Sequence, residues 1–287
     1  MKRRALSESP YIWTMPSPLK KYLLIPRLAW LSAGAPKERT IAWDRYWAGI
    51  KTTGLHGEVL WDAGADHELL GYGDSLKRHL DPDLPVLDIG CGNGRFTRWL
   101  GTHFPIAVGV DVSAHAVARA RAETNGTVNV SYLAHDMTLP GAAGEVLGRA
   151  IASDPAGGRG EVNVFIRGVL HVLDEADQAA LAENLRELVG VRGRLFLAET
   201  DFRGNGLEYV SHLGATLRCI PTPLRSAIKG LPMPGHFGPA ERARVFRSEA
   251  WELMEEGSAS IETVPMKNPS EPGVIPGYYA VLRANQR

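Results

Sequence analysis

Apolar and polar positions follow two alternating periods through the middle of the chain. Five short apolar runs have the length and composition of buried strands. These runs are residues 86–89, 105–110, 128–134, 162–166 and 195–199. Between them, apolar residues recur three and four positions apart, as in 114–124, 139–153 and 176–189, which is typical of helices with one buried face. Strands that alternate with helices favour an α/β fold built on a parallel sheet.

The first strand leads into a glycine-rich turn. Gly90, Gly92 and Gly94 occupy alternate positions immediately after the apolar run, and Asp88 stands two residues before the first of them. A helical pattern with apolar residues three and four apart begins at Phe96. Such a turn lets a ligand approach the backbone, and the following helix begins with unpaired N–H groups at its positive dipole end.

The spacing of the glycines separates two families of cofactor-binding turn. The dinucleotide pattern G-x-G-x-x-G requires a third glycine where this chain has Arg95. The string D-I-G-C-G-N-G, residues 88–94, instead resembles the first motif of the class I S-adenosylmethionine-dependent methyltransferases, D/E-x-G-x-G-x-G. A glycine turn without a ligand is the alternative interpretation of this motif taken alone.

Two later elements extend the resemblance. Asp111 ends the second strand, 17 residues after Gly94, where a carboxylate accepts hydrogen bonds from ribose hydroxyls in nucleotide-binding folds. The third strand ends in His135, Asp136 and Met137, which resembles the element that reads the adenine edge in these methyltransferases. A solvated turn aspartate is the alternative role for Asp136.

The resemblance implies a fold, a cofactor and a set of binding residues. The fold is a seven-stranded, mostly parallel sheet with helices on both faces, closed by an antiparallel pair over 251–264 and 275–283. The cofactor is S-adenosyl-L-methionine, and the reaction is methyl transfer by in-line displacement at the sulfonium carbon. The implied cofactor-binding residues are Asp88, Gly90, Cys91, Gly92, Gly94, Asp111, Val112, Asp136, Met137 and Arg167.

Segments outside the sheet are expected to cover the site. We expect residues 1–75 to form a helical N-terminal arm and cap, and residues 76–287 to form the cofactor-binding domain. Trp43, Tyr46 and Trp47 lie on one face of a cap helix. The proline-rich interval 201–248 is an insertion between strands five and six. Because the carboxyl ends of the strands face the ligand crevice, we expect the cap and the insertion to form a roof over a small acceptor.

Composition and charge narrow the choice of partners. The 287 residues have a formal net charge of zero and a pI near 7.1, so no global field favours nucleic acid. Cys91 and Cys219 are the two cysteines, which argues against a disulfide framework and for a reducing cytoplasm. No cluster of carboxylates and histidines stands at metal-ligand spacing, so we expect no metal.

The first 39 residues differ from the rest in charge. They contain eight Lys or Arg against Glu8 and Glu38, a local net charge of +6. The apolar run 22–30 is interrupted by Pro26 and Arg27 and is far shorter than the roughly 20 residues that span a bilayer. Two interpretations remain: an arm that packs on the domain or on a second subunit, or a contact with an anionic membrane or an acidic partner. Because the cofactor motifs lie downstream, we expect this segment to matter for assembly or pocket closure more than for cofactor binding.

His171 is the candidate acid–base residue. It follows the fourth strand by five residues, in a segment that the resemblance places beside the transferred methyl. A histidine can accept a proton from a hydroxyl or amine at neutral pH. A packing role is the alternative, and His212 and His236 in the insertion are weaker candidates.

The sequence therefore predicts methyl transfer to a small-molecule acceptor, such as a specialised metabolite, with oxygen, nitrogen and carbon acceptors all open. Enzymes that methylate protein amides or DNA amines usually carry D/N-P-P-Y/F after the fourth strand, whereas this chain has R-G-V-L at 167–170. A metal-ligating aspartate of the catechol-type enzymes would stand where Arg167 places a positive charge. The alternative from another class is a protein that binds S-adenosylmethionine without transferring its methyl group.

Overall fold

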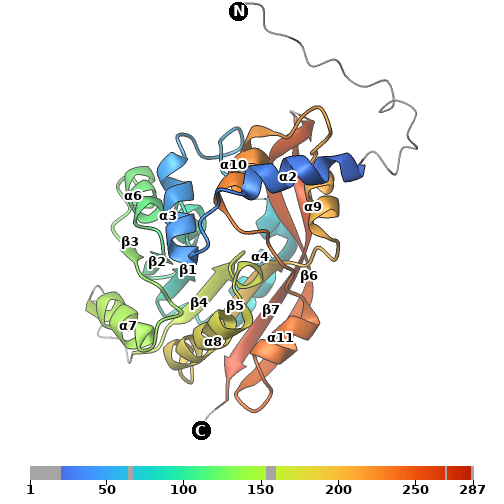
Figure 1. Ribbon diagram of the computed structural model, residues 1–287. Helices are drawn as coiled ribbons and strands as arrows, with labels where there is room; N and C mark the ends of the chain where they lie inside the picture. Colours follow the sequence, from blue (N-terminus) through green and yellow to red (C-terminus); the bar gives the residue numbers. More distant parts are fainter. Residues whose placement is uncertain (1–20, 64–66, 153–159, 269, 286–287) are drawn as a thin grey trace, which may run out of the picture.

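Seven strands form one sheet in the order β3-β2-β1-β4-β5-β7-β6 (Figure 1). The computed structural model describes residues 21–63, 67–152, 160–268 and 270–285. The parallel strands are β1 (Val86–Ile89), β2 (Ala107–Asp111), β3 (Val130–Ala134), β4 (Asn163–Arg167) and β5 (Leu195–Thr200). An antiparallel hairpin, β6 (Trp251–Asn268) and β7 (Glu271–Ala284), closes the edge beyond β5. Because the strand order reverses between β1 and β4, their carboxyl ends open the crevice in which ligands bind to such sheets.

Helices cover both faces of this sheet. Those between the parallel strands are α5 (Arg95–Leu100), α6 (Ala114–Glu123), α7 (Ala142–Ala152) and α8 (Glu175–Val189), with a short 3-10 turn, η3 (Leu170–Val172), after β4. The segment before β1 forms η2 (Lys21–Leu24), α2 (Ile25–Ser32), α3 (Arg39–Gly49) and α4 (His67–His79). The insertion after β5 forms α9 (Gly206–His212), α10 (Thr222–Gly230) and α11 (Pro239–Val245). Side-chain caps at Ser113, Asp174 and Asn205 fix the start of three of these helices.

Successive side chains of a strand point to opposite faces of the sheet, so the apolar core has two parts, one on each face. Leu87, Ile89 and Ile166 pack toward α7 and α8 on one face. Phe165 and Phe196 point to the other face, where they meet α4 and the helices of the insertion. Because β1 and β4 are buried on both faces, they read as nearly continuous apolar runs in the sequence.

The expected fold class is confirmed, and the details differ at the edges. The hairpin is longer than predicted, because β6 and β7 continue to pair past residues 264 and 275 toward a turn near Asn268. The insertion forms three short helices despite its prolines, because α9 and α10 bury apolar side chains in the core. The boundary expected between residues 75 and 76 falls inside α4, which packs against β6 and β7.

Two other observations concern helix length and the cysteines. Among the described residues, no helix is long and apolar enough to cross a membrane. Cys91 is buried and Cys219 is exposed, and both are free thiols. The expectation that residues 1–20 belong to an N-terminal arm falls outside the described residues.

Candidate active site

A cavity of about 810 Å³ lies at the carboxyl ends of β1, β2 and β4. Its floor is formed by the glycine turn and by the segments that follow these strands. Its roof comes from α2, α3 and the insertion, which are distant in sequence and adjacent in space (Figure 1). Cap and insertion thus both border one cavity.

The glycine turn has the conformation that its sequence requires. Gly90, Gly92 and Gly94 all have positive φ values, of 77°, 53° and 74°. A Cβ at Gly92 would lie 2.9 Å from Cζ2 of Trp47, and one at Gly90 would collide with Val169. Larger residues would therefore be strained and would also displace the walls of the cavity.

Asp111 stands at the end of β2 on the cavity wall, next to Val112. Its carboxylate accepts the Gly92 N–H at 2.9 Å and the Ser113 N–H at 2.9 Å, so it is tied directly to the glycine turn. Burial raises the pKa of Asp111 to about 6, although the hydrogen bonds from Ser113 and Gly92 oppose this shift. Its expected role of binding ribose hydroxyls stays a prediction.

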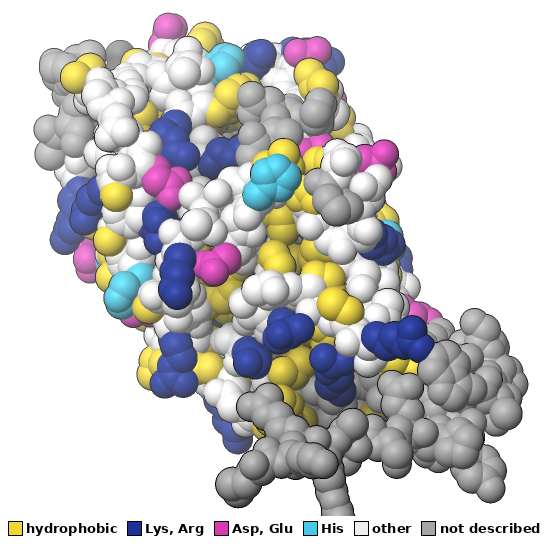
Figure 2. All heavy atoms as spheres, turned by 90° about the horizontal axis from the view of Figure 1, so that it is seen from above, with side chains coloured by type: hydrophobic (Ala, Val, Ile, Leu, Met, Phe, Trp, Pro, Cys, Tyr) yellow, Lys and Arg dark blue, Asp and Glu magenta, His cyan; other side chains and the backbone are white. Residues whose placement is uncertain are grey.

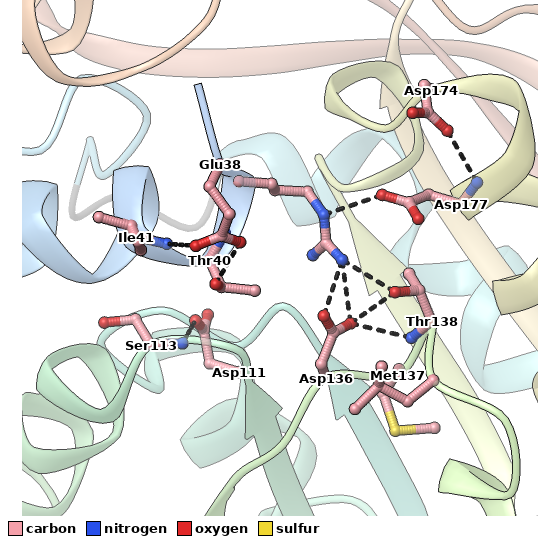
Figure 3. A network of polar contacts seen from close by, with 12 residues as sticks. Glu38, Thr40, Ile41, Asp111, Ser113, Asp136, Met137, Thr138, Asp174 and Asp177 are labelled. Atoms are coloured by element: carbon pink, nitrogen blue, oxygen red, sulfur yellow. Dashed lines mark hydrogen bonds and ion pairs between the residues drawn. The ribbon is translucent and has the colours of Figure 1, made fainter. Parts of the chain in front are cut away.

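Asp136 and Met137 also line the cavity, and Asp136 has a partner that the sequence did not indicate (Figure 3). Arg39, the first residue of α3, donates from Nη2 to both carboxylate oxygens of Asp136, at 2.8 and 3.1 Å. Its Nε donates to Asp177 of α8 at 3.0 Å. The cap is thereby joined to the residue expected at the adenine edge.

Three expected cofactor residues, Asp88, Cys91 and Gly94, do not line the large cavity, and Asp88 and Cys91 line a smaller one next to the glycine turn. Asp88 is fully enclosed and accepts a hydrogen bond from Thr97 of α5 at 2.5 Å. Burial raises the pKa of Asp88 to about 7. The Cys91 side chain packs with Val117, Ala120 and Tyr132. Asp88 thus links the end of β1 to α5, and the backbone N–H of Cys91 donates to the Val110 carbonyl at 3.1 Å.

Arg167 is held in a buried ion pair. Its guanidinium donates to both carboxylate oxygens of Glu68 from α4, at 2.8 and 2.5 Å, and stacks on Phe96 at 5.1 Å. Glu68 also accepts from the Tyr72 hydroxyl and the Glu262 N–H. Burial of the pair is balanced by this bidentate contact, which raises the pKa of Arg167 and lowers that of Glu68. Arg167 thus anchors α4 beside the cavity.

A second, smaller cavity of about 40 Å³ adjoins the glycine turn. Asp62, Asn93 and Arg95 line it. Asp62 is buried and accepts from the Gly54 N–H and from Asn93 Nδ2 through Oδ2, whereas its Oδ1 has no hydrogen bond among the described residues. Arg95 Nη1 lies 3.8 Å from that oxygen. A carboxylate and a guanidinium side by side suit the ammonium and carboxylate groups of an amino acid.

His171 lies on the cavity wall and is fixed by a carboxylate from β5. Its Nδ1 lies 2.7 Å from Oε2 of Glu199, which is completely buried. The other Glu199 oxygen accepts the N–H groups of Val169 and Leu170, each at 2.9 Å. Glu199 therefore fixes both the ring and the turn that carries it. This hydrogen bond leaves Nε2 of His171 as the nitrogen available toward the cavity.

Apolar side chains line the roof of the cavity and the wall next to it. They come from α9, α10 and the hairpin, and include Leu207, Val210, Leu224, Ile228, Ile261 and Ile275. Two hydroxyl groups interrupt this surface. Thr200 Oγ1 is buried and has no hydrogen bond within the described chain, and burial raises the pKa of Tyr209 to about 12, so its hydroxyl stays protonated.

The two other histidines proposed as acid–base candidates lie away from this cavity. His212 bonds the Val274 carbonyl at 2.7 Å and packs on Phe202. His236 is 44% exposed and lies 3.2 Å from Glu241. Neither side chain lines the cavity. Within the described ranges, no group of three or more His, Cys, Asp or Glu side chains is arranged to hold a metal ion.

Several residues of the site were not found by sequence reasoning. Glu199 is the last residue but one of the parallel strand β5, so the rule that ligands bind at carboxyl ends indicates its position but not its partner. Arg39, Asp62 and Glu68 precede the first motif and have no local pattern that distinguishes them from surface charges.

Comparisons with known proteins agree with this geometry. A family model described as a methyltransferase domain matches residues 86–147, which include the glycine turn, Asp111 and Asp136. A structure of an S-adenosylmethionine-dependent methyltransferase from Anabaena variabilis ATCC 29413 has a TM-score of 0.72, with 24% identity, over 88% of this chain and 97% of that chain. A structure described by the conversion of a disulfide bond into a thioacetal group during echinomycin biosynthesis has a TM-score of 0.60, with 18% identity, over 86% and 93% of the two chains.

One curated protein is similar over a short segment. The 23S rRNA (uracil(1939)-C(5))-methyltransferase RlmD of Methylococcus capsulatus is 39% identical over 80 residues, which make up 26% of this chain and 18% of that enzyme. The match thus spans under a fifth of the relative's length. These similarities confirm the fold, and the match of the family model to the glycine turn, Asp111 and Asp136 supports S-adenosylmethionine as the cofactor.

Proposed function

We propose that this chain, a class I S-adenosylmethionine-dependent methyltransferase, methylates a small, largely apolar acceptor whose nucleophilic atom carries a proton. The observation that supports this most directly is the shared cavity. His171 and the glycine turn border the same space as the apolar side chains under the roof. An acceptor in this cavity would lie between the glycine turn and the apolar side chains of the roof.

The residues present fit the cofactor. Gly90 and Gly92 of the glycine turn border the large cavity, Asp111 offers a carboxylate beside them, and the buried Asp62 Oδ1 near Arg95 accepts no hydrogen bond within the described chain. We assign Asp111 to the ribose, Asp136 and Met137 to the adenine, and the smaller cavity to the methionine end. When bound, S-adenosylmethionine supplies an electrophilic methyl carbon on a sulfonium ion. The Trp47 ring borders the same space and offers a face to that positive charge.

The protein's own contribution is to position the acceptor and accept its proton. In-line attack requires the nucleophile to lie about 3–3.5 Å from the methyl carbon, so the apolar walls act by orienting the acceptor. Nε2 of His171 accepts the proton of the attacking group, and the Glu199 carboxylate stabilises the imidazolium through Nδ1. Thr200 and Tyr209 provide hydroxyls for polar groups elsewhere on the acceptor.

A polymer is a poorer fit for this cavity. Side chains from α2, α3, α9 and α10 all border it, so a folded RNA or protein would have to displace the roof to bring an atom to the methyl group. Apolar side chains also provide few partners for phosphates or peptide groups. The same enclosure supports a small molecule with a modest number of polar atoms.

Methyl-labelled S-adenosylmethionine tests the proposal directly. The full chain is incubated with panels of apolar phenols, hydroxylated aromatics, amines and thiols, and with total RNA, and S-adenosylhomocysteine is followed by chromatography. We expect acceptor-dependent release with members of the small-molecule panel and none with RNA. Labelling of RNA would contradict the proposal. Cofactor binding without transfer to any acceptor would instead favour a protein that binds S-adenosylmethionine for another purpose.

A cavity-filling variant sharpens this test. Ala227 of α10 lines the cavity, and Ala227→Trp should raise the acceptor KM by at least about tenfold, because a large ring occupies the space of the acceptor. The affinity for S-adenosylhomocysteine should stay within about twofold. Ala240→Trp on exposed α11 is the matched control and should change neither value.

A further inference from the structure

The mouth of the cavity can be located from side chains that line it and also reach solvent. Ile25 of α2 lines the cavity and is 49% exposed, and Met233 after α10 lines it and is 48% exposed. Ala29 and Ser32, on the same side of α2, also line the cavity and are exposed. The cavity therefore opens between α2 and the segment around residue 233.

Exposed apolar side chains extend from this mouth along α2. Trp30 is 76% exposed and Leu23 is 38% exposed, although the opposite side of the same segment buries Leu24 and Leu31 in the core. A tryptophan left in water loses the free energy of burying a large ring. The segment thus has two apolar sides, of which the protein core covers one.

The same region is positively charged. Segments 21–37 and 216–233 contain six basic residues and no Asp or Glu: Lys21, Arg27, Lys37, Arg218, Arg225 and Lys229. The two segments are neighbours, because α2 packs against α10 and Arg27 donates to the Leu217 carbonyl at 2.9 Å. Seen from above, dark-blue Lys and Arg side chains surround yellow apolar patches on this face (Figure 2). The neutral net charge of the chain conceals this local excess.

We propose that this region is a docking face for the surface of an anionic membrane, with the mouth of the cavity against the lipid. The docking face consists of Leu23, Ile25, Trp30 and Met233, together with Arg27, Lys37, Arg218, Arg225 and Lys229. Apolar side chains enter the boundary between headgroups and acyl chains, and the cations meet the lipid phosphates. Tryptophan favours this depth, because its ring is apolar and its N–H is polar. The eight residues of α2 lie in the interface and do not span it.

Other occupants fit this face less well. A symmetric dimer through the docking face would place its five basic residues against the same five, with no acid in segments 21–37 and 216–233 to balance them. Nucleic acid would match the charge but would leave Trp30, Leu23 and Ile25 without an apolar partner. A lipid surface satisfies both properties at once.

Docking would also explain the apolar cavity. An acceptor dissolved in the bilayer would reach the active site without crossing water, because the mouth faces the lipid. This consequence rests on the proposed methyl transfer to an apolar acceptor, whereas the docking itself does not. The two are therefore tested by separate measurements.

Vesicle sedimentation tests the docking. The full chain is mixed with vesicles of phosphatidylcholine alone or with 30% phosphatidylglycerol, an anionic fraction of about one lipid in three. We expect binding to the anionic vesicles at low salt and a loss of at least about tenfold in the partition coefficient at high salt. Trp30→Ser combined with Lys229→Glu should reduce binding by a similar factor. Neither side chain lines the cavity, so S-adenosylhomocysteine affinity by calorimetry should not change.

A matched control changes the same chemistry elsewhere. Val128→Ser combined with Arg247→Glu alters two exposed residues at the amino ends of the parallel strands, opposite the cavity, and should bind vesicles as the wild type does. Equal binding of wild type and docking variant, or no binding to anionic vesicles, would overturn the proposal. A dimer by analytical ultracentrifugation that the docking variant abolishes, without vesicle binding, would assign the face to a second copy. Methyl transfer with no vesicle binding would leave the proposed function intact and remove only the docking.

Discussion

The proposed cofactor end of the cavity and its proposed acceptor end differ in how far apart their residues lie in the sequence. Gly90, Gly92, Asp111, Asp136 and Met137 come from three successive strand ends within 48 residues. The acceptor end combines α2, α3, α9, α10 and the hairpin, which extend from near residue 25 to residue 275. The first end is built on backbone turns and carboxylates, and the second on apolar side chains.

The difference follows from what each end has to recognise. The ribose and adenine of S-adenosylmethionine always have the same polar groups. They require hydrogen-bond partners at set positions, which strand ends provide. An apolar acceptor requires only a shape, which many combinations of side chains can form. The residues of the cofactor end can therefore be recognised from sequence motifs. The shape of the acceptor end depends on how distant helices and strands pack together.

Two contacts link the ends. Arg39 joins the cap to Asp136 on the cofactor side, and Glu199 of β5 fixes His171, which follows β4. The expectation that residues 1–39 act on closure more than on cofactor binding stays a prediction, and Arg39 is the residue of that segment that touches the expected adenine site. The following variants probe how separate the two ends are.

The largest effect is expected at His171. His171→Ala should lower turnover by at least about a hundredfold, because a positioned base contributes about 10²- to 10⁴-fold. The affinity for S-adenosylhomocysteine should stay nearly constant, since the ring acts on the acceptor. His236→Ala, on an exposed histidine outside the cavity, is the control and should change turnover by less than about twofold. A fall of only a few-fold in His171→Ala would make the residue structural.

Glu199→Gln tests the positioning role separately. The neutral amide stabilises a protonated imidazole less than a carboxylate does, so kcat should fall while the acceptor KM changes little. The pH at which turnover declines on the acid side should move lower. A lower stability with an unchanged pH profile would show that Glu199 only supports the turn through the Val169 and Leu170 N–H groups.

The next effect concerns Asp111 at the cofactor end. Asp111→Ala should weaken S-adenosylhomocysteine binding by more than about tenfold, because hydrogen bonds to a charged acceptor contribute about 1.5–3 kcal/mol. In the wild type, the carboxyl has a pKa of about 6, and the charged form is the better acceptor. Affinity should therefore rise between about pH 5 and pH 7 and then level off.

Asp111→Asn is the matched variant for the pH dependence. It keeps the shape of the side chain and cannot ionise, so calorimetry should give a weak affinity that changes little over the same range of pH. An unchanged slope in Asp111→Asn would assign the titration to another group. An unchanged affinity would remove Asp111 from the cofactor site.

A smaller effect is expected where the two ends meet. Arg39→Ala should weaken S-adenosylhomocysteine binding by about two- to fivefold, because a partly exposed ion pair contributes less than about 1 kcal/mol and its loss frees the cap. Asp177→Ala removes the contact to α8 and leaves Asp136 paired, so it should have a weaker effect. Equal loss in both variants would mean that cap closure, and not the adenine edge, explains the change.

No effect is expected from metal removal. Treatment with EDTA should leave turnover unchanged, since His171 supplies the proton acceptor and the cofactor supplies the electrophile. The measurement is turnover with the best acceptor before and after dialysis. Activity that EDTA abolishes and magnesium restores would contradict this mechanism.

Most of the sheet could be predicted from the sequence because its signals are local. The apolar run around Leu87, the positive-φ glycines after it and the acid that ends β2 act within a few residues of one another. The strand order then follows from the fold that these motifs indicate. The ends of the hairpin could not be predicted as well, because pairing between β6 and β7 continues after the core ends.

In the candidate site, too, residues with a local motif could be predicted and residues defined by long-range contacts could not. The glycine turn, Asp111, Asp136 and the position of His171 could be located from the sequence, since each belongs to a strand end with its own motif. The contact between Glu199 and His171 and the ion pair between Arg167 and Glu68 became visible only in the folded chain.

The physical reason lies in the nature of these contacts. An ion pair or a hydrogen bond between residues 28 or 99 positions apart leaves no periodicity in either segment. The partner of a buried charge is set by which strands and helices are neighbours in space. The acceptor cavity likewise exists only after α2, α10 and the hairpin have packed around it, because its shape belongs to the gap between elements and to no single segment.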